Sequence, residues 1–283
     1  MSRAFSLILS AVVLGQPTTT PEGAAKPVSE AAGTIEDFKA DAKQYAMSLD
    51  ARPNAVFQLR EEPLLHWDNP ARTGEDGAVF VWLLDGRPQV IGSVFTYRLP
   101  KVIRRKHEYH SLAAGPMTAI YRGARVWAPQ AAGVTWQPVP DAPPVPPSAR
   151  GRLSQMKTLA RNFSATLERR TGEKDALRLL PQPLLRYQGD DKKTDGALFS
   201  FSIGTDPEAI LLLEASLAGD SPGWQFAFAR YHFLDLRASY RDREVWHVEA
   251  MPEDVSLLEI GTPQYQDSVY ATYHTATTPI DEP

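Results

Sequence analysis

The chain has 283 residues, 43% of them hydrophobic, which is enough to bury one large core or two cores of ordinary domain size. A formal net charge of −4 provides no basic surface of the kind that nucleic-acid binders concentrate, so no nucleic-acid partner is expected. Cysteine is absent, which excludes disulfide bonds, thiol catalysis and thiolate metal sites.

The amino terminus has the composition of a secretory signal peptide, predicted here as residues 1–15. Arg3 supplies positive charge, residues 4–14 form a short apolar run, and cleavage is expected near Gly15. The alternative is a buried N-terminal helix, because the run is too short to span a membrane. Without a later apolar stretch of about 18 residues, the sequence predicts an exported protein, periplasmic or extracellular, with no transmembrane segment in the mature chain.

Residues 16–33, rich in Pro, Thr, Ala and Gly, predict a disordered linker. A helix is then predicted from Thr34, with Asp37 as a capping-box partner, and its apolar spacing continues to Leu49. Short apolar runs divided by Pro, Gly and Asp follow, as in antiparallel sheets. They predict strands near residues 56–60, 63–67, 77–84, 89–97, 107–113 and 118–127.

The second half of the chain repeats this plan after a segment, 134–148, that carries six prolines and predicts an extended connector. Apolar spacing over 153–167 predicts a second helix. Strands are expected near residues 176–180, 183–188, 196–203, 208–216, 223–231 and 234–247. Residues 251–283 contain one more possible strand, 255–260, and otherwise predict a polar tail.

Three blocks of sequence occur twice in the same order, at offsets of 119 or 120 residues, which indicates an internal duplication. They are Pro63-Leu64-Leu65 and Pro183-Leu184-Leu185, Asp76-Gly77-Ala78 and Asp195-Gly196-Ala197, and Tyr121-Arg122 with Val126-Trp127 and Tyr240-Arg241 with Val245-Trp246. We predict repeat domain 1 at residues 34–133, repeat domain 2 at 149–250 and a C-terminal extension at 251–283. The blocks resemble those of exported bacterial proteins with a tandem repeat, and this resemblance implies no activity.

The expected fold class is α+β, with two homologous domains that each pack an amphipathic helix on a curved antiparallel β-sheet. A pair of β-sandwiches with an attached helix is the alternative. Asp76-Gly77 and Asp195-Gly196 are interpreted as hairpin turns. Val79, Val81 and Leu83 make one face of a predicted strand apolar in the first repeat, whereas two of the three matching residues in the second repeat are serines. This face is expected either to dock against the second repeat or to line a ligand cleft.

Candidate binding residues come from two places. His107, Glu108 and His110 form a histidine cluster beside the basic residues Arg104 and Arg105, although a strand would point the two histidines to opposite faces. Arg122 and Arg241 occupy matching positions in the repeats, where stacking on an aromatic ring or binding an anion would explain them.

We find no nucleophile elbow, phosphate loop or dinucleotide motif, and no catalytic residue, metal site or cofactor is assigned. The leading hypothesis is a non-catalytic binding or scaffold protein of the periplasm or cell envelope, whose partner is an envelope component or a small ligand. The repeats are expected to pack on each other. The alternatives are an exported metal-dependent hydrolase centred on His107, Glu108 and His110, and a carrier of an apolar molecule.

Overall fold

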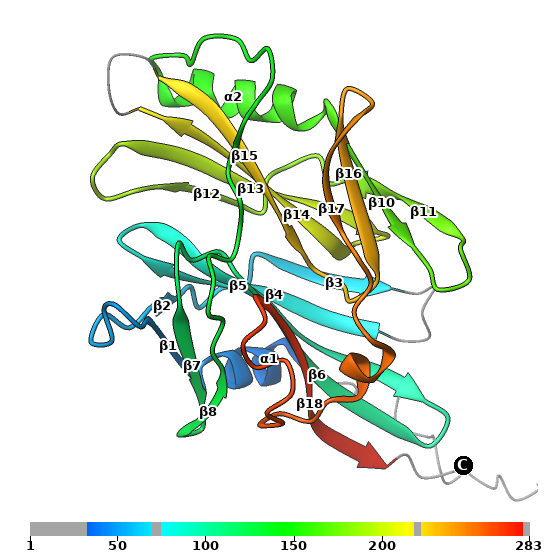
Figure 1. The fold of residues 1–283 in the computed structure, drawn as a ribbon. Helices are drawn as coiled ribbons and strands as arrows, with labels where there is room; N and C mark the ends of the chain where they lie inside the picture. Colours follow the sequence, from blue (N-terminus) through cyan, green and yellow to red (C-terminus); the bar gives the residue numbers. More distant parts are fainter. Residues whose placement is uncertain (1–32, 70–74, 218–221, 280–283) are drawn as a thin grey trace, which may run out of the picture.

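The computed structural model describes residues 33–69, 75–217 and 222–279, so the predicted signal peptide lies outside the described residues. Strands account for 53% of the structure and helices for 11%. The predicted α+β class is therefore wrong: the protein is mostly β, and its sheets curl into two half-barrels (Figure 1). The central strands of both halves are buried on both faces, so sheet pairing and sheet packing, not helix packing, build the interior.

The elements follow the same order in the two halves of the chain (Figure 1). The first half contains α1 (Ile35–Ala42), β1 (Tyr45–Leu49), β2 (Gln58–Leu59), β3 (Leu65–Asn69), β4 (Glu75–Leu84), β5 (Arg87–Leu99), β6 (Val102–Ser111), β7 (Met117–Tyr121) and β8 (Ala124–Trp127). The second half contains α2 (Ala149–Ala160), β10 (Phe163–Glu168), β11 (Lys174–Leu179), β12 (Leu185–Gln188), β13 (Thr194–Ile203), β14 (Asp206–Ser216), β15 (Gly223–Arg230), β16 (Asp235–Tyr240) and β17 (Arg243–Val248). The remaining elements are β9 (Gln137–Pro138), the 3₁₀ helix η2 (Glu253–Leu257) and β18 (Tyr270–Pro279).

The strands pair in the same spatial order in both halves. The second half forms one antiparallel sheet, β17-β16-β10-β11-β13-β14-β15-β9, with β12 beside β13. In the first half this order is divided into two sheets, β8-β7-β1 and β2-β4-β5-β6-β18, with β3 beside β4. An isolated β-bridge between Ser48 and Val56 connects these two sheets. The first half therefore curls in the same way as the second, but with fewer backbone hydrogen bonds at this junction.

Both helices end earlier than their apolar spacing predicts. The sequence predicts helix to Leu49 and to Leu167, whereas α1 ends at Ala42 and α2 at Ala160. The residues that follow belong to β1 and β10, in which alternate side chains are buried. A strand buries every second residue, so two of its buried residues can also be four apart, as on one face of a helix. Over so few residues the two patterns are not distinguished, and apolar spacing alone extends the predicted helix too far.

The two Asp-Gly pairs do not form hairpin turns. Gly77 and Gly196 lie inside β4 and β13, and a Cβ atom on either would collide with the aromatic ring of Trp67 or Tyr187 on the neighbouring strand. Glycine is required here because the ring lies across the strand backbone. One actual hairpin turn is at Asp85-Gly86, where both residues have positive φ.

The segment that follows each half completes the sheet of the other half. β9, after the first half, pairs with β15, and β18, after the second half, pairs with β6 along its whole length. The expected polar tail is therefore wrong between Tyr270 and Pro279. The expected strand at 255–260 is also wrong, because its first half belongs to the helix η2. The C-terminal segment forms a strand because it pairs with the otherwise unpaired backbone groups at the edge of β6. This long-range pairing cannot be read from the composition of the segment itself.

Three clusters of buried side chains fill the molecule. Two lie inside the half-barrels, each including residues of its helix: Phe38 with Trp82 in the first and Met156 with Phe201 in the second. The third lies between the half-barrels and combines Val79 and other residues of both sheets. Figure 1 shows the two half-barrels one above the other, with α2 near the top of the view and α1 within the lower one.

This third cluster decides between the two expectations for the apolar face of β4. Val79 and Val81 have no exposed surface and pack against the other half, so the face is an internal interface. Ser200 and Ser202 of β13, which correspond to Val81 and Leu83, are also buried and hydrogen-bond to each other at 2.8 Å.

Candidate functional site

Strand β6 carries most of the residues predicted from the sequence, and its alternation divides them between two surfaces. Arg105 and His107 face the inside of the first half-barrel, where both approach Asp41 of α1. Glu108 and His110 face the other way, where both lie beside Tyr270 of β18. The prediction that the two histidines point to opposite faces is confirmed, and His107 and His110 do not converge on one site.

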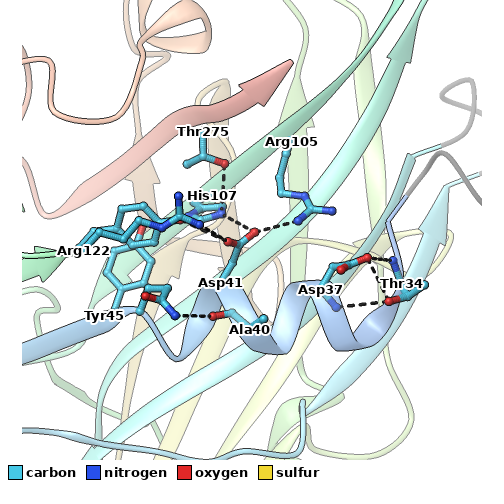
Figure 2. Close-up of polar contacts among 11 residues, drawn as sticks. Thr34, Asp37, Ala40, Asp41, Tyr45, Arg105, His107, Arg122 and Thr275 are labelled. Atoms are coloured by element: carbon cyan, nitrogen blue, oxygen red, sulfur yellow. Dashed lines mark hydrogen bonds and ion pairs between the residues drawn. The ribbon is translucent and has the colours of Figure 1, made fainter. Parts of the chain in front are cut away.

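Figure 2 shows the polar cluster on the inner surface, where Asp41 in the last turn of α1 meets side chains from several strands. Its carboxylate accepts hydrogen bonds from Arg105 at 3.0 Å and from the Tyr121 hydroxyl at 3.2 Å. Arg122 lies 3.4 Å away, and His107 Nε2 lies 3.6 Å from Asp41 Oδ2. One carboxylate therefore joins α1 to β6 and β7.

The protonation states in this cluster are consistent with a structural role. Burial acts to raise the pKa of the Asp41 carboxyl, but the neighbouring His107 and Arg105 outweigh it and lower that pKa to about 2. Burial lowers the pKa of His107, whose Nδ1 is 2.8 Å from the Tyr45 hydroxyl and whose Nε2 is 3.3 Å from that of Thr275. Because His107 has no exposed surface, we assign this cluster to holding α1 in the half-barrel.

A crevice of about 370 Å³ opens on the other surface of β6, between the two half-barrels. Its walls come from both halves and are unusually mixed in chemistry. The aromatic side chains are Trp67, Phe95, Tyr97, Tyr231 and Phe233, and the ionisable ones are Glu75, Lys106, Glu108, Arg169, Asp206 and His232. We name this space the inter-repeat crevice.

Its innermost polar groups are held by contacts that run across both halves. Glu108 accepts a hydrogen bond from the Tyr270 hydroxyl, so β18 fixes the carboxylate. Lys106 donates to the Ser256 carbonyl at 3.2 Å, and its Nζ lies 5.4 Å from the centre of the Phe233 ring. Asp206, at the start of β14, accepts from the side chain of Asn69 at 3.1 Å.

The loop from β15 to β16 forms one wall of the crevice and is fixed by Arg230. This buried guanidinium donates to the carbonyls of His232 and Leu234 at 3.0 and 2.8 Å, and lies 5.4 Å from the Tyr270 ring. Three backbone and ring contacts from one side chain hold the loop and β18 together, which places Tyr231 in the crevice wall.

Burial changes the proton affinity of two groups in this wall. It lowers the pKa of Lys106 to about 8, although the nearby carboxylates of Glu108 and Glu75 act to raise it. Burial raises the pKa of Tyr231 well above 10, so its hydroxyl stays protonated. That hydroxyl is buried and has no hydrogen-bond partner in the part of the chain that the structure describes.

A second crevice, of about 420 Å³, is the counterpart of the first under the internal duplication. At an offset of 119 residues, its lining residues Arg87, Leu112 and Gln225 correspond to Asp206, Tyr231 and Lys106. We name it the mate crevice. In it, Arg87 forms an ion pair with Glu214 at 2.6 Å, and Glu214 also accepts from the Tyr187 hydroxyl at 2.7 Å.

The comparison of the two crevices identifies what is particular to the first. The ionisable Lys106 and Glu108 replace Gln225 and Ala227, and three consecutive residues, Tyr231-His232-Phe233, replace Leu112-Ala113-Ala114. At these positions the residues of the mate crevice are apolar or, like Gln225, hydrogen-bonded within the crevice. The inter-repeat crevice carries charged and aromatic side chains there instead.

The remaining predicted residues lie elsewhere. His110 donates from Nε2 to the Gly133 carbonyl at 2.9 Å, and burial lowers its pKa to about 4. Arg122 and Arg241 have positive φ in the turns of two hairpins, and their guanidinium groups lie 5.0 and 5.2 Å from the rings of the preceding tyrosines. Arg104 lies opposite Tyr97 in the β5–β6 ladder. The structure thus places Glu108 alone of the predicted residues in the wall of the inter-repeat crevice.

Sequence reasoning missed Lys106, Asp206 and Tyr231. Lys106 was hidden in a basic run that is ordinary for a surface hairpin, and the other two are more than 90 residues away along the chain. The offset of 119 residues is the signal that could have identified Lys106. Aligning β6 with β15 at this offset shows that Lys106 and Glu108 are matched by the neutral residues Gln225 and Ala227.

Comparison with protein-family models, with curated proteins and with solved structures finds no match for this chain. Within residues 33–69, 75–217 and 222–279, no three His, Asp or Glu side chains are grouped as metal ligands would be. Among the same residues, neither α-helix has the length and apolar character needed to cross a membrane.

Proposed function

We propose that this protein is a binding protein whose small polar ligand occupies the inter-repeat crevice. One observation carries the proposal: Lys106, Glu108, Asp206 and Tyr231 are each at least nine-tenths buried and line the same open space. Burying ionisable groups costs free energy that stability alone does not explain, and a ligand would use them. The volume is of the size that small-molecule sites have, at the low end of roughly 300–1,000 Å³.

The chemistry of the wall favours a ligand with polar groups and a flat apolar part. Carboxylates from Glu108 and Asp206 accept hydrogen bonds, Lys106 donates them, and the Phe95 and Phe233 rings are partly exposed beside them. The apolar rim continues to Leu257, whose side chain is 64% exposed. We therefore expect a ring-bearing or partly apolar molecule with oxygen or nitrogen substituents.

Neither alternative function draws support from the described residues. A metal-dependent hydrolase centred on His107, Glu108 and His110 requires side chains that lie on two faces of β6. A carrier of an apolar molecule inside a curved sheet requires space there, whereas large buried side chains such as Trp82 and Trp127 occupy the inside of the first half-barrel. The predicted export depends on residues 1–15, and the proposed binding does not depend on it.

The proposal is tested by a thermal-shift screen with amino acids, sugars, aromatic acids and aromatic amines. A ligand at about 100 times its Kd should stabilise the protein by about 3 kcal/mol, a shift of several degrees. The shift should be lost in Phe233→Ala and retained in Trp136→Ala, the matched truncation in the mate crevice. A panel without stabilising ligands, or shifts that depend on Trp136 instead, would contradict the proposal.

A further inference from the structure

Lys106 and Glu108 are presented side by side to the inter-repeat crevice. They are separated by one residue on β6, so both side chains lie on the same face of the strand, with Cα atoms about 7 Å apart. Lys106 is 6% exposed and Glu108 8% exposed, and both line the crevice. An amine and a carboxylate therefore border the same crevice.

The surroundings of the amine are those of a nucleophilic lysine. The charged and titratable groups that act on Lys106 come from three strands: Glu75 of β4, Arg104 and Glu108 of β6, and His274 of β18. Burial lowers the pKa of Lys106 to about 8, so a substantial fraction is the neutral amine near pH 7.5. An ordinary surface lysine with a pKa near 10.4 is almost entirely protonated at that pH.

We propose that Lys106 captures a small aldehyde or ketone in the inter-repeat crevice as a reversible imine. This inference rests on the proposed function and names the class of ligand that the crevice takes. A desolvated amine in a partly apolar site is an arrangement that proteins use for Schiff-base formation. The matching position in the mate crevice is Gln225, which cannot form an imine, so the reactive amine is particular to the inter-repeat crevice.

The reaction needs no reagent besides the ligand. The neutral Lys106 nitrogen forms a bond to the carbonyl carbon while the carbonyl electron pair moves to oxygen, and transfer of the amine proton to that oxygen gives a carbinolamine. Glu108 can carry that proton, since it is within the same wall. The hydroxyl then leaves as water with the remaining proton of the nitrogen, so the carbon–oxygen bond breaks, a carbon–nitrogen double bond forms and one water is released for each imine.

Tyr231 can act as the donor to the carbonyl oxygen. Its hydroxyl stays protonated and lacks a hydrogen-bond partner among the described residues, and the ring is 1% exposed in the crevice wall. A hydrogen bond from this hydroxyl would polarise the carbonyl and stabilise negative charge on its oxygen during attack.

The test is reductive trapping of the full-length protein with benzaldehyde and sodium cyanoborohydride near pH 7.5, followed by peptide mass mapping. We expect the N-benzyl adduct to form at least about tenfold faster on Lys106 than on Lys174, because burial in the crevice leaves a substantial fraction of Lys106 as the neutral amine. Lys174 is a suitable internal control because its side chain is 61% exposed on β11. The rate on Lys106 should level off above about pH 8.

Three variants distinguish a loss of the trapping reaction from a loss of folding. Lys106→Arg retains a cation and should remove the fast adduct, whereas Lys174→Arg should leave it unchanged. Glu108→Gln should slow trapping at Lys106 at least about threefold, with urea unfolding used to establish that each variant is folded.

Equal trapping of Lys106 and Lys174 in the wild-type protein would overturn the imine and leave the binding proposal standing, since the thermal-shift comparison of Phe233→Ala with Trp136→Ala is measured without any trapping reaction. A wild-type protein that no ligand of the thermal-shift screen stabilises, with fast trapping at Lys106 retained, would overturn the broader ligand class instead.

Discussion

Single residues in this protein are often fixed by a partner far away in the sequence. Gly196 shows this: the Asp-Gly dipeptide has the local preference of a turn, but the residue lies in β13 with the Tyr187 ring across it. Its preceding Asp195 is 2% exposed and accepts from Arg152 at 2.6 Å and from Arg186. A dipeptide propensity was outweighed by packing between strands.

Gly196→Ala should destabilise the protein by about 1–3 kcal/mol, because the added methyl group overlaps the Tyr187 ring and the strand or the ring must shift. Gly223→Ala is the matched control: it lies at the start of β15 with open space around it and should change stability by less than about 0.5 kcal/mol. Urea denaturation measures both. Equal effects would show that the ring contact is not what requires glycine.

Asp41→Asn should also destabilise, by about 3–5 kcal/mol, because it leaves Arg105 without its buried carboxylate. The loss should shrink in acid. The folded-state pKa of Asp41 is lowered to about 2 from 3.8, so its contribution is present above about pH 4 and disappears as the pH falls towards 2. Unfolding of wild type and variant across that range measures the difference, and a constant gap would contradict this assignment.

At the scale of elements, the strand pattern was largely visible and the helix limits were not. The capping box at Thr34 and Asp37 is confirmed by reciprocal hydrogen bonds, and Figure 2 shows it at the start of α1. The predicted strands at 118–127 and 234–247 are each two strands, because positive φ at Arg122 and Arg241 makes tight hairpins. Arginine is not a typical residue for such a turn, whereas the residues that follow, Gly123 and Asp242, also have positive φ and are typical of it.

Strand β18 is expected to be essential for the first half-barrel. Deleting residues 270–283 removes the partner of β6 and the Tyr270 hydroxyl that binds Glu108, so we expect loss of cooperative unfolding and association through the exposed edge. Deleting residues 276–283 keeps the buried part of the strand and should preserve the fold. Circular dichroism during urea titration and size-exclusion chromatography compare the two, and similar behaviour would contradict the role given to residues 270–275.

For the whole molecule, buried neutral histidines predict loss of stability in mild acid. Burial lowers the pKa of His110 and of His274 to about 4, below the unfolded value of 6.5. Between these values the unfolded chain binds protons that the folded protein does not, so stability falls as the pH decreases. Each group should contribute a loss of about 2 kcal/mol from pH 7 to pH 5.

His110→Gln should therefore flatten this dependence relative to the wild-type protein. Urea unfolding of both proteins at pH 7 and pH 5 gives the comparison. A dependence on pH that is the same in the variant and the wild type would show that His110 is not one of the responsible groups.

The sequence by itself determined the duplication, the antiparallel strands and the opposite orientation of His107 and His110, because each follows from local periodicity or from comparison of one repeat with the other. Only the tertiary structure decided the β-rich class, the exchange of β9 and β18 between the halves and the gathering of Lys106, Asp206 and Tyr231 around one crevice. These depend on which sheet edges and faces meet, and such pairing is set by burial between residues distant in the chain, which local patterns do not encode.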